Sequence, residues 1–202
     1  MKKLIGLALA CALLLAGCAP RGGGEEAEEL GDNSIRPLEL TEEEEALLNL
    51  VGNGLGLGSA YGVYQLAVGE TVTGCSIEVL SWVDGGWQAT GGGSVGISGS
   101  SDALRLGVVL GDGDVRINWQ DGSGQYSITA AVSSMDRSGA GLTWAWLEEA
   151  QALTVGERAP LYLAVYDDGD GVTSAALPDS FFDVAYLSQY DRAYAVAITL
   201  EG

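Results

Sequence analysis

The chain has 202 residues, no histidine, and 28 acidic side chains against nine basic ones, which gives a formal net charge of −19 at pH 7. This excess of negative charge argues against nucleic-acid binding, because positive groups are needed to displace counterions from phosphates. Without histidine, the Ser-His-Asp and Cys-His pairings of nucleophilic enzymes are excluded. The only lysines are Lys2 and Lys3, so the rest of the chain has no lysine for a Schiff base or a phosphate-binding loop.

The first eighteen residues have the layout of an export signal. Lys2 and Lys3 give a positive start, and the apolar run over residues 4–16 has the length of a signal-peptide core. That run is too short to cross the roughly 30 Å hydrocarbon core of a bilayer as a helix. The residues at its end, Leu15-Ala16-Gly17-Cys18, resemble the lipobox of bacterial lipoproteins.

In that family, a diacylglyceryl group is attached to the cysteine, and cleavage leaves this cysteine at the new N-terminus. The resemblance implies that residues 1–17 are a signal peptide and that acyl chains such as palmitate on Cys18 hold the protein at the extracytoplasmic face of a bacterial membrane. Each buried CH₂ contributes about 0.8 kcal/mol to such an anchor, and stable attachment takes more than one chain. Residues 18–202 would then carry seven arginines and 28 acids, or 7 − 28 = −21.

Residues 18–45 are predicted to form a disordered acidic tether. Ten acidic residues and a single arginine lie between Glu25 and Glu45, and such a stretch buries little apolar area. A short helix is expected to begin after Thr41, which forms a capping-box pattern with Glu44, and to end near Gly52.

Residues 46–202 are predicted to form one mainly-β domain. From about residue 60, apolar side chains recur at every second position, as at Val115, Ile117 and Trp119, which is typical of half-buried strands. Asp-Gly pairs such as Asp84-Gly85 supply the positive φ angles of tight hairpins. We expect nine or ten strands in an antiparallel β-sandwich, or alternatively a β-barrel, with the short N-terminal helix and room for one more around residues 179–189.

Aromatic side chains are the first candidates for a ligand site. Trp119, Trp144 and Trp146 fall on the apolar faces of their strands, so we expect them in the core. Two other aromatics flank a predicted turn, and two more are predicted on the face of a strand that points away from the core. A sugar or a peptide could stack on such rings. The side chains predicted to be exposed for this purpose are Trp82, Trp87, Tyr162 and Tyr166.

An acidic turn is the candidate metal site. Asp167, Asp168 and Asp170 lie within four residues, and calcium binds carboxylate oxygens from such loops. The spacing does not match an EF-hand, so a turn-forming role is favoured and no cofactor is predicted. Cys75 would have no intramolecular partner beside a lipidated Cys18, and we expect it to be a small buried side chain.

The composition and the resemblance together predict a membrane-anchored, noncatalytic binding or structural module. Its partner would be a protein or an envelope polymer such as a polysaccharide, and not a nucleic acid. The alternative is a small glycan hydrolase, because such enzymes work with two carboxylates and need neither histidine nor lysine. Nothing in the spacing of the candidates Glu78, Glu148, Glu149 and Glu157 selects a pair.

Overall fold

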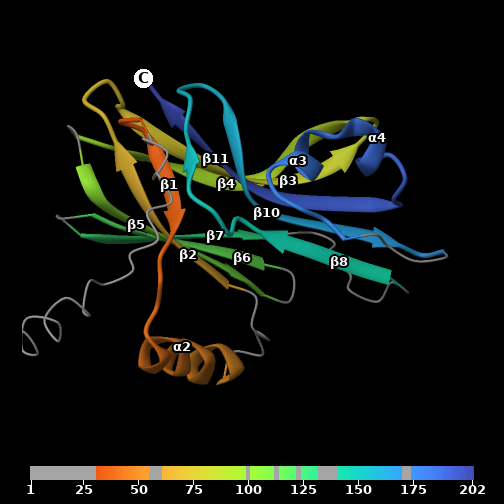
Figure 1. Ribbon diagram of the computed structural model, residues 1–202, viewed down its shortest axis with the longest axis horizontal. Coiled ribbons are helices and arrows are strands. Elements are labelled where there is room, and N and C mark those ends of the chain that lie inside the picture. Colours follow the sequence, from red (N-terminus) through yellow and green to blue (C-terminus); the bar gives the residue numbers. More distant parts are fainter. Residues whose placement is uncertain are drawn as a thin grey trace, which may run out of the picture.

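Two antiparallel sheets make up the domain (Figure 1). The computed structural model describes residues 31–54, 61–98, 101–111, 114–121, 124–131, 141–169 and 174–202. In spatial order, the six-stranded sheet consists of β7 (Gln125–Ala131), β6 (Asp114–Gln120), β5 (Ser101–Leu110), β2 (Tyr61–Val68), β1 (Ser34–Pro37) and β9 (Gln151–Ala152). The five-stranded sheet consists of β4 (Gly86–Gly96), β3 (Gly74–Val83), β11 (Arg192–Glu201), β10 (Arg158–Asp167) and β8 (Gly141–Trp146).

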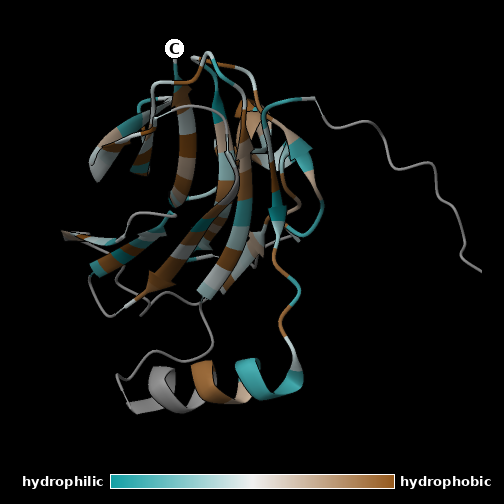
Figure 2. Cartoon of the chain, turned by 90° about the vertical axis from the view of Figure 1, so that its left-hand side faces the viewer, coloured by the Kyte–Doolittle hydropathy of each residue, from teal (hydrophilic) through white to brown (hydrophobic). Residues whose placement is uncertain are grey.

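The main core lies between the two sheets, where apolar residues face each other (Figure 2). Val115, Ile117 and Trp119 of β6 all point into it, as their alternation predicts. From β11, Val196 and Ile198 enter the same core from the opposite sheet. The sheets do not close into a barrel, so the predicted β-sandwich is confirmed over its alternative.

A second apolar cluster covers part of the outer face of the five-stranded sheet. It forms where α3 (Asp179–Phe182) and α4 (Val184–Leu187) bring Phe181 and Leu187 against Leu163 and Val165 of β10. We expected one helix here, but the segment divides at Asp183. This residue has an extended backbone, and its Oδ1 accepts a hydrogen bond from the amide of Tyr186 at 2.9 Å, so it ends α3 and caps α4.

The predicted N-terminal helix is present as α2 (Glu42–Gly54). Its capping box is formed: the Thr41 amide donates to Oε2 of Glu44 at 2.8 Å, and the Glu44 amide donates to Oγ1 of Thr41 at 3.3 Å. These hydrogen bonds lower the pKa of Glu44. α2 lies beyond one end of the sandwich (Figures 1 and 2), and its Leu47 is 57% exposed. No helix in the described part of the chain is long and apolar enough to cross a bilayer.

The domain begins earlier than the predicted boundary between tether and domain. Ser34–Pro37, which we assigned to the tether, forms β1 inside the six-stranded sheet, paired on one side with β2 and on the other with β9. One apolar side chain, Ile35, is fully buried by these neighbours, and a single residue is too little for a hydrophobic pattern to detect. Residues 1–30, with the predicted signal peptide and Cys18, lie outside the described residues.

Candidate functional site

Trp82 and Trp87 flank the β3–β4 hairpin, and the predicted turn between them is confirmed. Asp84 and Gly85 have φ angles of 51° and 81°, as a two-residue hairpin loop requires. The ring of Trp87 stacks on Phe181 at 4.9 Å, and its Nε1 donates to the carbonyl of Phe181 at 3.0 Å. Trp82 meets Trp87 edge-on at 5.2 Å. Both tryptophans are half-buried beneath α3, so they hold the covering helix on the sheet rather than forming an open platform.

The prediction that Tyr162 and Tyr166 are exposed is wrong. Both are buried in the main core, where Tyr162 lies 4.6 Å from the ring of Trp146 and Tyr166 lies 5.7 Å from the ring of Tyr194. The alternation in β10 misled because α3 and α4 cover the face that carries Leu163 and Val165. The four predicted ligand-binding aromatics therefore lie on opposite sides of the five-stranded sheet.

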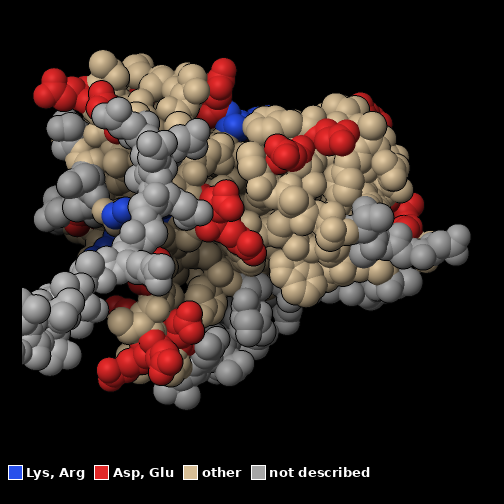
Figure 3. All heavy atoms as spheres, viewed as in Figure 1, with Lys and Arg blue, Asp and Glu red and all other residues tan. Residues whose placement is uncertain are grey.

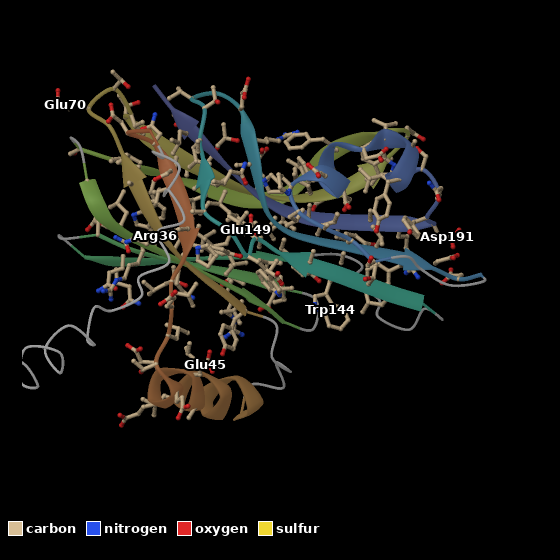
Figure 4. The ribbon with its side chains drawn as sticks, viewed as in Figure 1. Arg36, Glu45, Glu70, Trp144, Glu149 and Asp191 are labelled. Carbon is tan, nitrogen blue, oxygen red and sulfur yellow. The ribbon has the colours of Figure 1, made fainter. Side chains whose placement is uncertain are left out.

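Trp144 was predicted to lie in the core, but it is exposed. Trp119 is buried and Trp146 is half-buried, but Trp144 is 56% exposed, and it projects from β8 (Figure 4). β8 is an edge strand of the five-stranded sheet, so a side chain on its inner face is not covered by a further strand. The position of a strand within its sheet therefore decides the burial of this tryptophan.

The acidic turn after β10 uses its carboxylates within the protein. Oδ1 of Asp167 accepts a hydrogen bond from the Gly169 amide at 2.8 Å, which stabilises the turn. Asp168 pairs with the guanidinium of Arg192 at 3.2 Å. Asp170 lies outside the described residues. Among the residues that are described, no three acidic or cysteine side chains are grouped so as to hold a metal ion.

Cys75 is buried in the main core, as predicted. Removal from water raises the pKa of its thiol to about 12, and the negative charge of Glu201 adds to this effect. At neutral pH the thiol is therefore protonated, and a protonated thiol is a poor nucleophile.

The structure brings a different set of residues together at the end of the sandwich nearest α2. They line an open pocket of about 590 Å³ between the start of β2, the end of β8 and the segment that leads from β1 to α2. The lining residues are Pro37–Leu40, Glu45, Tyr61–Tyr64 and Trp146–Glu148.

Two aromatic rings form the floor of this pocket because position 62 has no side chain. A Cβ on Gly62 would lie 2.6 Å from the hydroxyl of Tyr64 and 2.8 Å from Cε3 of Trp146, so any larger residue would displace these rings. Glycine therefore lets both rings lie against the backbone of β2. The Trp146 ring also contacts Tyr162, whose ring centroid lies 4.6 Å away.

A bulge in β10 supports the floor. Leu161 falls between the pairs Pro160–Ala197 and Tyr162–Val196, so it is left out of the ladder with β11. Its carbonyl instead accepts hydrogen bonds from the hydroxyl of Tyr64 and from the amide of Leu147, both at 3.0 Å. Burial raises the pKa of Tyr64 far above its usual value, so this hydroxyl remains a neutral donor. The bulge thus joins three segments beneath the pocket.

Acidic side chains form the rim. Glu39, Glu45 and Glu148 belong to the lining, and none of its described residues is basic. Figure 3 shows acidic atoms over α2 and again above it, while basic atoms are sparse on this side of the molecule. These carboxylates can accept hydrogen bonds from hydroxyl or amino groups of a ligand. Only Glu148 was among our sequence candidates, because the three residues come from segments that no local motif connects.

The chain matched no protein-family model, and no curated protein or solved structure is significantly similar to it.

Proposed function

We propose that this protein is a membrane-anchored binding module without catalytic activity, displayed on the extracytoplasmic face of a bacterial membrane. Its pocket receives part of a protein or of an envelope polymer. The observation that supports binding is the indole of Trp146, packed against Gly62 and Tyr162, in the lining of an open pocket that also contains three carboxylates. Ligand sites commonly combine apolar and aromatic walls with a few polar groups that orient the ligand.

The anchor is supported by the resemblance of residues 15–18 to a lipobox. Replacing Cys18→Ala should release the protein from the membrane fraction or leave it unprocessed, because acyl chains supply the attachment. Fractionation of cells grown with a labelled fatty acid measures both effects. A labelled, membrane-bound mature form of the variant would refute the anchor.

Binding is tested with the full-length protein in detergent, purified peptidoglycan and a panel of polysaccharides. We expect saturable binding with a change in tryptophan emission. Trp146→Phe should abolish that change, whereas Trp144→Phe should retain it, because Trp144 projects from the same strand but does not line the pocket. If none of these polymers binds, the proposal turns to protein partners in the envelope. If the two variants respond alike, the pocket is not the site.

A carboxylate-dependent glycan hydrolase remains the second candidate, because Glu39, Glu45 and Glu148 surround one pocket. The binding mixtures would then release sugar, and Glu148→Gln would stop this release without changing the melting temperature. Saturable binding without release of sugar favours the noncatalytic module.

A further inference from the structure

A row of arginine and glutamine side chains crosses the outer face of the six-stranded sheet. The register pairs Arg36 with Gln65, Gln65 with Arg105, Arg105 with Gln120, and Gln120 with Gln125. All five alternate with residues that point into the core, so they share the solvent face. Within the row, Nη2 of Arg36 donates to Oε1 of Gln65 at 2.9 Å.

The rows beside this one leave it accessible. The next row toward the start of β2 has smaller side chains, with Gly107 opposite Asn118. The row beyond it places Arg116 opposite Val109. Arginines therefore stand on both sides of a row of smaller residues.

The charge of this face differs from that of the chain. Its outward-facing described residues include Arg36, Arg105 and Arg116, but only one acid, Asp114, which pairs with Arg116 at 3.4 Å. The sum over these strand residues is 3 − 1 = +2 in a chain whose net charge is −19, and Glu44 of α2 is the nearby acid that opposes it at Arg105. Arg105 is exposed and forms no salt bridge with any described residue, although Glu44 at the start of α2 lies close enough for the charge of Arg105 to contribute to its lowered pKa.

We propose that this face binds an extended anionic polymer whose carboxylates recur along the chain, such as a glycan that contains uronic acids. A guanidinium binds a carboxylate through two parallel hydrogen bonds, and the glutamine amides can pair with sugar hydroxyls. Arg36 and Arg105 are two strands apart, or about 10 Å, so they contact separate carboxylates of one polymer. The inference rests on the proposed function as a binding module and names the polymer class, but it does not use the pocket.

The test titrates the full-length protein in detergent with polygalacturonate, with neutral dextran as the comparison polymer. Arg105→Gln should weaken polygalacturonate binding about tenfold, as expected for the loss of a charge-assisted pair, and Arg36→Gln/Arg105→Gln should weaken it further. Arg158→Gln is the matched control: it removes the same charge on the other sheet, where Arg158 pairs with Glu78, and should leave affinity within about twofold. Melting temperatures confirm that the variants are folded.

The outcomes separate this inference from the proposed pocket. Polygalacturonate binding that depends on the arginines and persists in Trp146→Phe supports the face as a site of its own. No binding, or equal effects of Arg105→Gln and Arg158→Gln, overturns the inference. The proposed pocket is tested separately with the Trp146→Phe variant, so its result does not depend on this outcome. An arginine-dependent preference for micelles with phosphatidylglycerol, without polymer binding, would assign the face to lipid headgroups and would also overturn it.

Discussion

The outer faces of the two sheets have opposite environments. On the five-stranded sheet, α3, α4 and the ring of Trp87 cover the outer face, so β10 and β11 are buried on both sides. On the six-stranded sheet, exposed or half-buried polar side chains alternate with core residues, as in β6. Polar residues appear where a face is left open. The outer face of the five-stranded sheet also has a polar row beyond the covered part, and its residues are Ser94, Ser76, Thr199 and Arg158.

The largest predicted effect tests the covered face. Leu163→Ala removes a fully buried side chain beneath α3 and α4 and should lower the free energy of unfolding by about 2–5 kcal/mol. Urea denaturation followed by tryptophan fluorescence measures it. A loss below about 1 kcal/mol would mean that the helices only rest loosely on the sheet.

The pH dependence of the free energy of unfolding tests the main core between the two sheets, through Cys75. Because the folded pKa of Cys75 is raised to about 12, the unfolded chain releases this proton first as the pH rises. The stability that this raised pKa contributes is fully present below about pH 8.5. As the pH rises toward 12 it is lost, and the free energy of unfolding falls by up to about 1.4 kcal/mol per pH unit. Denaturation midpoints of the protein and of Cys75→Ala at pH 8 to 11 provide the comparison. Equally steep curves would show that Cys75 does not contribute.

The helix outside both sheets should respond locally. Thr41→Ala removes the cap of α2 and should destabilise that helix by about 1 kcal/mol. Because α2 lies beyond the sandwich, we expect faster amide exchange in residues 42–48 and no change in the global denaturation midpoint. A shifted midpoint would indicate that α2 is coupled to the sheets.

The smallest effect is expected on the uncovered face. Val109→Ala also shortens an aliphatic side chain within a strand, but there it should change the free energy of unfolding by about 0.5 kcal/mol or less. It is the surface counterpart of Leu163→Ala in the same denaturation experiment. Similar losses for both variants would abolish the distinction between the two outer faces.

The same distinction explains which predictions from sequence are correct. In β6, Val115 and Ile117 alternate with polar residues because one side meets water, so the pattern alone identifies the core. In β10, both sides are apolar, and alternation could not tell Tyr162 from Leu163. A signal was present in β11, where Ala193, Ala195 and Ala197 fill alternate positions; such small residues fit a face on which another element packs closely.

The candidate site was harder to predict because contacts between distant segments create it. The sequence contains Trp146, Gly62 and Glu45, but only the fold brings them to one pocket. The bulge at Leu161 has no local sequence motif beyond the neighbouring proline, which cannot donate to the ladder. By contrast, the turn at Asp84-Gly85 and the capping box at Thr41 depend on neighbouring residues, and both were predicted correctly.

The place of β11 within its sheet has a consequence for the order of assembly. β11 lies between β3 and β10, so it supplies the hydrogen-bonding partner of both strands. Its pairing with β3 joins Glu201 to Gly74, a contact between residues far apart in the sequence, and such contacts slow folding. The five-stranded sheet cannot be completed until residues 192–201 have been synthesised. Before then, β3 and β10 have open edges on which another chain could pair.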